Sequence, residues 1–415
     1  MRVKEKRETR NRAVLYALPA VYNVKRGVRS RAFMATTTQT GALRRVLEEN
    51  VREGELYEKL DRGFARCFAC GHCCRIPDGQ LGICKVRFNR GGKLYVPWGY
   101  VGGVQCDPIE KKPFFHAYPG ALAYSFGMLG CDLHCSYCQN WVTSQALRDP
   151  SAVSPPLGVS PKELVGDALR QGAKVVVSTY NEPLITSEWA VEIFKEARAR
   201  GLTTGFVSNG NGTPQALEYL RPWVDLYKVD LKSFDDRHYR QLGGRIEPIL
   251  ETIRRLHEIG LWVEIVTLVI PGFNDSDDEL RRLAEFLVSV SPDIPWHVTA
   301  FHKDYKMTDP ENTSPETLLR AAAIGKKAGL RYVYAGNLPG HVGDLENTRC
   351  PSCDALLIER YGYLITGYHL TANGCCPSCG ASIPGRWAAK FQGQITDLPY
   401  VPHMRRRSNL ISILH

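Results

Sequence analysis

The chain has 415 residues, of which 44% are hydrophobic and 23% are charged. This length allows two or three domains, and the composition supports a sizeable buried core, which excludes wholesale disorder. The formal net charge is +10, but residues 1–33 carry ten Lys or Arg against Glu5 and Glu8. The rest of the chain is therefore close to neutral and gives no electrostatic reason to expect a nucleic acid or an anionic membrane as a partner. Its longest uncharged apolar runs are also shorter than the roughly 20 residues that span a bilayer, so we expect no transmembrane segment.

The fourteen cysteines fall into three groups, at 67–106, 131–138 and 350–379. A secreted disulfide protein would carry a clear apolar signal segment. The only candidate is the run 13–22, which Pro19 interrupts and which Lys25 and Arg26 closely follow. The cysteines also stand at the spacings of metal ligands. We therefore predict a cytoplasmic protein whose thiolates bind metal.

The chain divides into five predicted regions. Residues 1–40 form a basic, disordered arm, for which an upstream start before Met34 and a targeting peptide are the alternatives. Residues 41–120 form a Cys-rich N-terminal segment, in which the spacing of Leu43, Val46, Leu47 and Val51 predicts a helix over 41–60. Residues 121–345 form the core, residues 346–390 a small separate module, and residues 391–415 a tail.

Strands and helices alternate along the core. Apolar runs predict strands at 121–128, 174–179, 203–208, 224–231, 262–270, 296–301 and 331–334. Capping boxes at Ser160–Glu163 and Ser276–Glu279, and Ser or Thr before Pro at 213–214 and 314–315, predict helix starts. This alternation predicts an α/β fold with a parallel sheet. Six or seven such units, without a G-x-G-x-x-G motif, favour a partial (β/α)6-type barrel over a dinucleotide-binding sheet, and place the chemistry at the carboxyl ends of the strands.

A three-cysteine loop, Cys131, Cys135 and Cys138, directly follows the first predicted core strand. The spacing C-x3-C-x2-C supplies three thiolates to three irons of a 4Fe–4S cluster and leaves the fourth iron without a protein ligand. An open coordination site is useful to a catalytic cluster and uncommon in an electron carrier. His134 is the alternative fourth ligand for a zinc ion, but its position next to Cys135 would strain such a site.

This loop resembles the signature of the radical S-adenosylmethionine (SAM) superfamily. The resemblance implies that the free iron binds SAM, and that reductive cleavage of SAM yields a 5′-deoxyadenosyl radical that abstracts a substrate hydrogen. The fold expected is then a radical SAM barrel. Tyr137 would lie against the adenine, or be an ordinary packed aromatic. Glu182 and its neighbour Asn181, in the sequence STYNEP, would accept the SAM ammonium, or form a helix-capping turn. Ser208 and Asn209 would bond the ribose hydroxyls, or form an Asn-Gly turn.

Further charged residues follow the later strands. Asp230 and Lys232 resemble the Asp-x-Lys of glycyl-radical activases, although a surface ion pair is the alternative. His297 and His302 flank the sixth core strand, and His302 is a candidate catalytic group.

Six segments of the chain resemble the AmmeMemoRadiSam-system radical SAM enzymes, which are relatives of pyruvate formate-lyase activating enzymes. These segments are CFACGHCCRIPDGQLGICKVR, DPIEKKPFFHAYPG, GCDLHCSYCQNW, STYNEP, WHVTAFHKDYKM and YVYAGNLPG. The resemblance spans about residues 60–385 and departs at Gly71, where the family usually has Pro, and in the Cys73-Cys74 doublet.

Two further cysteine sets flank the core. Cys67, Cys70, Cys74 and Cys84 suit structural zinc or an auxiliary iron–sulfur cluster, and register with the family makes Cys74 the ligand and Cys73 the extra thiol. Cys350, Cys353, Cys376 and Cys379 have the spacing of a zinc ribbon, with a rubredoxin-type iron as the alternative. Cys375 is a spare thiol, and Cys106 is expected to pack as a small apolar group.

The predicted function is therefore that of a radical SAM oxidoreductase with a 4Fe–4S cluster, SAM and zinc. It would act on a protein or a small molecule and take electrons from a one-electron donor such as a flavodoxin or ferredoxin. The alternative is a non-catalytic iron–sulfur and zinc protein that carries electrons or acts as a scaffold. The missing fourth cysteine near the loop disfavours the electron carrier, and the near-neutral charge disfavours nucleic-acid binding.

Overall fold

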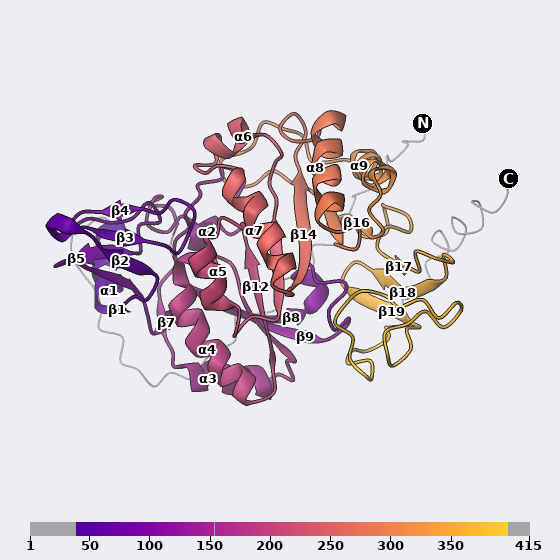
Figure 1. The fold of residues 1–415 in the computed structure, drawn as a ribbon, viewed down its shortest axis with the longest axis horizontal. Coiled ribbons are helices and arrows are strands. Elements are labelled where there is room, and N and C mark those ends of the chain that lie inside the picture. Colours follow the sequence, from indigo (N-terminus) through magenta and orange to yellow (C-terminus); the bar gives the residue numbers. More distant parts are fainter. Residues whose placement is uncertain (1–38, 153, 397–415) are drawn as a thin grey trace, which may run out of the picture. The chain divides into compact units, whose positions relative to one another are not determined.

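The computed structural model describes residues 39–152 and 154–396 and is shown in Figure 1. The predictions for the basic arm of residues 1–33, with its apolar run at 13–22, lie outside the described residues, as does the tail from residue 397. No helix in the described part of the chain is both long and apolar enough to cross a membrane.

An eight-stranded sheet forms the centre of the fold, in the order β16-β15-β14-β13-β12-β11-β9-β8. Neighbouring strands from β9 to β16 pair in parallel, and β8 pairs antiparallel with β9 at one edge. The strands are β8 Gly103–Pro108, β9 Leu122–Gly127, β11 Val175–Ser178, β12 Thr203–Ser208, β13 Leu226–Asp230, β14 Trp262–Val269, β15 Trp296–Ala300 and β16 Val333–Gly336. The predicted parallel strands are confirmed. The antiparallel strand β8 was not predicted.

Helices follow the parallel strands and cover the sheet. Figure 1 shows α4, α5, α7 and α8 side by side across it. The helices are α2 Trp141–Ser144, α3 Pro161–Arg170, α4 Ser187–Ala199, α5 Pro214–Leu220, α6 Asp236–Gln241, α7 Glu247–Glu258, α8 Asp277–Val290 and α9 Pro315–Ala328, with 3-10 turns η2 Ile109–Lys111 and η3 Pro183–Thr186. Since helices cover the sheet, strands such as β11 are buried at every residue, and this produces their continuous apolar runs.

The two predicted capping boxes differ in the structure. At α3 the box is complete, because Ser160 accepts from the Glu163 amide and the Glu163 carboxylate accepts from the Ser160 amide. At α8 Ser276 caps the Glu279 amide, but the Glu279 carboxylate instead accepts hydrogen bonds from Ser233 Oγ and from the Phe234 amide. Glu279 therefore joins α8 to the loop after β13. The prediction of a second capping box is wrong for one of its two hydrogen bonds, because the Glu279 carboxylate does not accept from the Ser276 amide.

The N-terminal segment is largely β structure. The predicted helix over 41–60 is wrong beyond α1, Gln39–Glu49. The chain continues as β1 Val51–Glu53, which pairs with β6 Lys93–Pro97, and as β2 Tyr57–Lys59, which pairs with β3 Ala65–Cys67. Strand pairing with later residues overrides the helical apolar spacing. The remaining elements are the 3-10 turn η1 Asp61–Gly63 and the strands β4 Arg75–Ile76, β5 Phe88–Arg90, β7 Tyr100–Val101 and β10 Leu157–Gly158.

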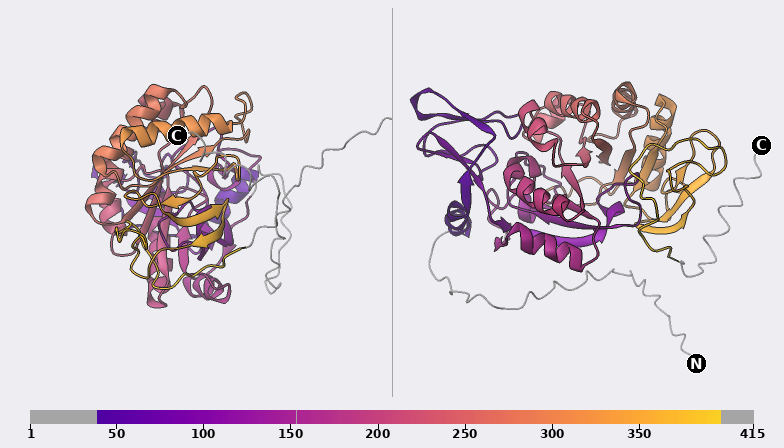
Figure 2. Two further views of the ribbon diagram at one scale, coloured as in Figure 1. Left: turned by 90° about the vertical axis from the view of Figure 1, so that its right-hand side faces the viewer. Right: turned by 60° about the horizontal axis from the view of Figure 1, so that its bottom comes forward.

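The C-terminal module contains a three-stranded sheet of β17 Thr348–Arg349, β18 Leu356–Tyr361 and β19 Leu364–Tyr368. Its apolar residues Leu357, Ile358 and Ile365 form one cluster with Phe115 and Tyr334 of the core. The buried Arg360 donates a 2.8 Å hydrogen bond to the Phe115 carbonyl. Since Tyr334 is the second residue of β16, the module docks at the amino ends of the strands. It therefore lies away from the carboxyl ends, which we call the mouth, and the right-hand view of Figure 2 shows it beside the barrel.

Candidate active site and metal centres

The three-cysteine loop lies at the mouth, directly after β9. Cys131, Cys135 and Cys138 pack against one apolar cluster that includes Leu133, Leu242, Ile270 and Phe301. The turn between the last two cysteines is closed by a 3.3 Å hydrogen bond from the Cys138 amide to the Cys135 carbonyl. The loop therefore presents three thiols from one short, well-packed segment, and this donor set fits three irons of a cluster.

Burial disfavours ionisation of these thiols. It raises the pKa of Cys135 to about 12 and the pKa of Cys131 well above its usual value, with the Asp132 carboxylate adding to the effect at Cys131. Burial also raises the pKa of Cys138, although Ser144 and Lys232 oppose it. Since metals bind thiolates, the protons of these thiols are displaced when metal binds.

The residues predicted to bind SAM at the second and third strands are joined in one hydrogen-bond network. Glu182 accepts from the Leu184 amide at 3.0 Å, from Ser208 Oγ at 2.7 Å and from the Asn209 amide at 2.8 Å. Burial and the nearby Asp132 carboxylate raise the pKa of Glu182 to about 8. The oxygens of Glu182 thus cap η3 and link β11 to β12, which matches the alternative of a helix-capping turn. Binding of SAM by Glu182 stays a prediction.

Asp132, inside the cysteine loop, was not predicted and lies at the centre of this network. Its two oxygens accept from Asn209 Nδ2 and Asn211 Nδ2, both at 2.7 Å. Asn181 is also engaged, because its Oδ1 accepts from the Met128 amide at 2.9 Å. The network therefore fixes the cysteine loop, the STYNEP turn and the loop after β12 relative to one another.

The turn at Tyr180 is strained, with a φ of 69°. Few residues other than glycine adopt this left-handed backbone conformation unless the surrounding structure supports it. Gly127, the last residue of β9, permits it, since a Cβ there would lie 2.4 Å from the Thr179 carbonyl and 2.8 Å from Tyr180 Cβ. The absence of a side chain at Gly127 thus lets the STYNEP turn approach the cysteine loop.

The predicted pair Asp230 and Lys232 lies at the mouth end of β13 and is extended by Lys228, which was not predicted. Asp230 accepts from the buried Lys228 and lies 3.8 Å from Lys232 Nζ. Although burial works against it, the Asp230 carboxylate, with Cys135 adding to the effect, holds the pKa of Lys232 well above its usual value. Lys232 thus remains a cation beside the cysteine loop. The Asp230–Lys232 pair is partly exposed, at 32% and 18%, and a catalytic role for it stays a prediction.

Aromatic and polar residues surround the loop on its other side. Tyr137 is buried edge-on against Phe273, with ring centroids 6.0 Å apart. His302 is exposed and its Nε2 lies 2.9 Å from Gln139 Nε2, which follows Cys138. Tyr305 stacks on Trp141, and the Lys306 amide donates to the Ser136 carbonyl at 2.8 Å. The predicted residue His302 is therefore at the mouth. His297 is not, because it is the second residue of β15 and is buried against Glu264.

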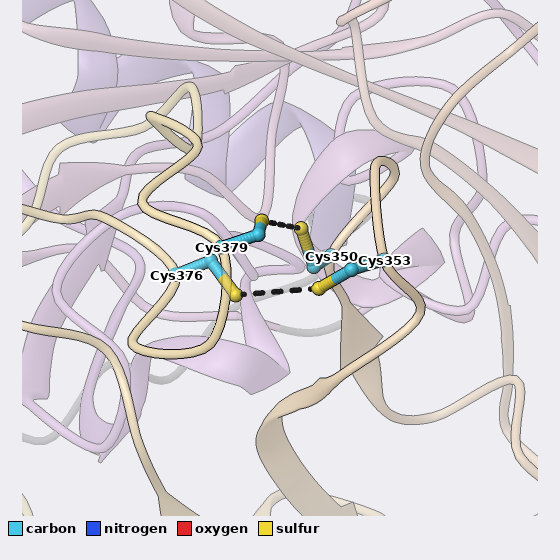
Figure 3. Close-up of side chains that lie close together, drawn as sticks. All are labelled: Cys350, Cys353, Cys376 and Cys379. Carbon is cyan, nitrogen blue, oxygen red and sulfur yellow. Dashed lines mark hydrogen bonds between the residues drawn. The ribbon is translucent and has the colours of Figure 1, made fainter.

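The four cysteines of the C-terminal module converge on one point (Figure 3). Their ligand atoms all lie within 4.8 Å of one another, with sulfur pairs Cys350–Cys379 at 3.6 Å and Cys353–Cys376 at 3.7 Å. Four Zn–S bonds of about 2.3 Å in a tetrahedron place the sulfurs about 3.8 Å apart. This set fits one metal ion, and within residues 39–152 and 154–396 it is the one such group of three or more His, Cys, Asp or Glu.

The cysteines of the N-terminal set lie in one region of the fold. Cys67, Cys70 and Cys84 are buried, and Cys70 and Cys84 share an apolar cluster with Val86 and Ile185. Burial, with the neighbouring Cys67 thiolate, raises the pKa of Cys84 to about 11 and also raises the pKa of Cys74. Cys73 is exposed, with a φ of 43°, whereas Cys74 packs against the core. This arrangement is the one expected if Cys74 is the ligand.

Comparison with known proteins identifies the family. A model of the radical SAM superfamily matches residues 127–287, from the end of β9 into α8. The chain is 39% identical over 313 residues to the uncharacterized protein MJ0808 of Methanocaldococcus jannaschii, covering 75% of this chain and 92% of that protein. The chain belongs to the radical SAM superfamily. It is therefore an enzyme, and the family implies a 4Fe–4S cluster and SAM as its cofactors.

Further curated proteins and solved structures share less of their sequence with this chain. A pyruvate formate-lyase-activating enzyme of Staphylococcus aureus is 29% identical over 243 residues, which cover 53% of this chain and 92% of that enzyme. Among solved structures, a domain of the pyruvate-formate lyase-activating enzyme of Bacteroides vulgatus matches 39% of this chain and 98% of its own, at 23% identity and a TM-score of 0.35. SuiB of Streptococcus suis matches 57% of this chain and 54% of its own, at 15% identity and a TM-score of 0.42.

Proposed function

We propose that this radical SAM enzyme is an oxidoreductase that generates a radical on a protein or small-molecule substrate, in the manner of an activating enzyme. When bound, the cluster and SAM would supply reductive cleavage of SAM to a 5′-deoxyadenosyl radical, which abstracts hydrogen from the substrate. The observation that carries the proposal is the position of Cys131, Cys135 and Cys138, three thiols on one loop at the mouth of a parallel barrel.

The surrounding residues have distinct proposed tasks. Lys232, a buried cation next to Cys135, favours a carboxylate such as that of SAM at the mouth. Asp132, Glu182 and Asn209 hold the loops in place, and Asn181 and Ser208 belong to the same network. Tyr137 forms an apolar wall, while Asp230 and the exposed His302 are the candidates for contact with the substrate at the rim.

Partners and metals complete the proposal. The enzyme needs a one-electron donor such as a flavodoxin or ferredoxin, and we place it in the cytoplasm, where thiols stay reduced. The C-terminal set would hold structural zinc in a closed tetrahedral shell, and the Cys67, Cys70, Cys74 and Cys84 set would hold zinc or an auxiliary cluster. Among the relatives, the S. aureus enzyme is named for activating pyruvate formate-lyase, which favours a protein substrate here.

The test is replacement of all three loop cysteines by alanine in the full chain. The iron of that site and the formation of 5′-deoxyadenosine should both be lost, measured by iron analysis and by chromatography after anaerobic incubation with SAM and dithionite. Cys106→Ala, a half-buried thiol in β8, is the matched control and should keep both. SAM cleavage by the triple variant at the rate of the control would disprove the proposal.

A further inference from the structure

The N-terminal cysteine set lies directly against the SAM-binding loop. Gly130, immediately before Cys131, has a φ of 94°, and a Cβ there would lie 3.1 Å from the Cys84 carbonyl and 2.8 Å from Val86 Cγ1. The backbones of the two cysteine segments are therefore in contact, with no room for a side chain between them.

Arg148 links the two segments through hydrogen bonds. Its Nη1 donates to the Cys131 carbonyl at 2.8 Å, and its Nη2 donates to the carbonyl of Ile83, the residue before Cys84, at 2.6 Å. One guanidinium thus holds a ligand segment of the first set against a ligand segment of the second.

Asn211 forms a second link. The Gly71 amide, next to Cys70, donates to the Asn211 carbonyl at 2.8 Å, and Asn211 Nδ2 donates to Asp132 Oδ2 at 2.7 Å. A proline at position 71 would have no amide hydrogen to donate, and a Cβ there would lie 2.4 Å from Asn211 Oδ1. The glycine that departs from the family pattern is therefore part of this link.

A buried cation lies beside the N-terminal set. Arg87 is 1% exposed, and both of its terminal nitrogens donate to Glu188. Its Nε is buried and has no hydrogen-bond partner in the part of the chain that the structure describes. Its Nη1 also donates to the carbonyl of Ile185, which packs against Cys70 and Cys84, so this guanidinium is held next to the N-terminal cysteines. Fixed positive charge and hydrogen bonds to sulfur favour the reduced state of an iron–sulfur cluster, whereas zinc has no reduced state to favour.

We propose that Cys67, Cys70, Cys74 and Cys84 hold a redox-active 4Fe–4S cluster that passes electrons to the SAM-binding cluster across the Arg148 and Asn211 links. This inference rests on the proposed function. The step is a transfer of one electron: the N-terminal cluster is oxidised by one electron and the SAM-binding cluster is reduced by one. The external one-electron donor then reduces the N-terminal cluster again, and no bond forms or breaks in the transfer.

The first test is the metal content of the full chain after anaerobic reconstitution with iron and sulfide. Two cubane clusters predict about eight irons per chain, and Cys70→Ser/Cys84→Ser should retain about four. Cys73→Ser, the matched control on the same segment, should retain the full content. Zinc bound to the N-terminal cysteines in place of iron would overturn the inference.

The second test counts electrons. The enzyme is reduced, freed of reductant and mixed with excess SAM, and the 5′-deoxyadenosine formed is measured. Since each cleavage consumes one electron, an enzyme with two connected clusters should give about two per chain, whereas the double serine variant should give about one.

The two tests separate failure of the inference from failure of the proposed function. A yield of about one per chain in the unmodified enzyme would overturn the electron relay while leaving SAM cleavage intact. No 5′-deoxyadenosine in either protein would overturn the proposed function itself. Should the double variant not fold, the electron paramagnetic resonance spectrum of the reduced unmodified enzyme still decides: two neighbouring clusters give spin-coupled, broadened signals, and signals of one isolated cluster contradict the inference.

Discussion

Arg87 and Glu188 form an ion pair that is almost completely removed from water, each with a side chain 1% exposed. Glu188, near the start of α4, also accepts from the amides of Glu55 and Leu56, both at 3.3 Å. These contacts attach the N-terminal segment to the barrel. Loss of one member leaves the other as an unpaired buried charge, which is far more costly than loss of an exposed pair.

We expect Arg87→Met to lower the free energy of unfolding by about 3–5 kcal/mol. The control is Arg66→Ala, which breaks the exposed pair with Glu58 and should cost no more than about 1 kcal/mol. Urea unfolding followed by circular dichroism measures both. Equal effects in the two variants would show that the buried pair does not hold the N-terminal segment in place.

At the level of residues, spacing and strand ends predicted the groups with a recognisable pattern. The loop cysteines, Glu182, Asn209 and Lys232 all lie at the mouth as expected. Asp132, Lys228, Arg148 and Asn211 were missed. Asp132, Arg148 and Asn211 act through contacts with distant parts of the chain, for example Arg148 with Ile83, and no local pattern reveals such contacts; Lys228 bonds Asp230, two residues along the same strand.

The turn from β9 into the cysteine loop requires glycine at position 130. Gly130 combines a left-handed backbone with a site that has no room for a Cβ. Gly172, between α3 and β11, has a similar φ of 76° but no atom within 4 Å of its Cβ position. Comparing substitutions at Gly130 and Gly172 therefore distinguishes the cost of backbone strain from the cost of a steric clash.

Gly172→Ala should cost about 1–2 kcal/mol through backbone strain alone. Gly130→Ala should cost more, and should also reduce iron incorporation, because it pushes the cysteine loop away from Cys84. Thermal unfolding and iron content after reconstitution check this expectation. Comparable losses of iron in both variants would mean that contact between the two segments is unimportant for the cluster.

At the level of elements, the parallel strands were predictable because each is an apolar run bounded by caps and glycines, as at β12, Thr203–Ser208. The elements that failed depend on pairing between distant residues. Val51 carries a helical apolar spacing, yet it pairs with Pro97, and β8 carries no continuous apolar run because only one neighbour pairs with it. Such pairings are decided by the tertiary fold and not by local sequence.

For the molecule as a whole, the C-terminal module lies far from the cysteine loop, so we expect its metal to affect the stability of the module and not the cleavage of SAM. The module contacts Phe115, His116 and Tyr334 at the amino ends of the strands, and the cysteine loop lies at the opposite ends. Cys353→Ser/Cys376→Ser should therefore lose about one zinc per chain and unfold the module locally, while SAM cleavage is retained. Zinc analysis, limited proteolysis and 5′-deoxyadenosine formation measure these effects. Loss of SAM cleavage together with the zinc would contradict this separation.

His116 makes the docking of this module sensitive to acid. Its Nδ1 lies 2.7 Å from the Pro384 carbonyl and its Nε2 lies 2.6 Å from the Tyr334 hydroxyl. Burial lowers the pKa of His116 from 6.5 to about 4, so the folded protein holds this imidazole neutral. Its contribution to stability is complete above pH 6.5. Below that pH only the unfolded chain gains the proton, and the contribution is lost as the pH falls to about 4.

We expect this loss to be on the order of 3 kcal/mol between pH 6.5 and 4. His116→Asn removes the titrating group, so its free energy of unfolding should fall less steeply over this range than that of the unmodified protein. His257→Asn, at an exposed position on α7, should keep the original pH dependence. Urea titrations at several pH values provide the comparison, and identical slopes for all three proteins would exclude His116 as the acid-sensitive contact.

The contacts between Cys84, Gly130, Arg148 and Asn211 also set an order of events during synthesis. A ribosome releases the N-terminal cysteines first, whereas Gly130 and Arg148 follow Cys84 by 46 and 64 positions and Asn211 follows it by 127. Until residue 211 has left the exit tunnel, these thiols are exposed to oxidants and to any free metal. Iron delivered early would meet an unfinished site. Assembly of the N-terminal metal centre is therefore expected to follow translation of the loop after β12.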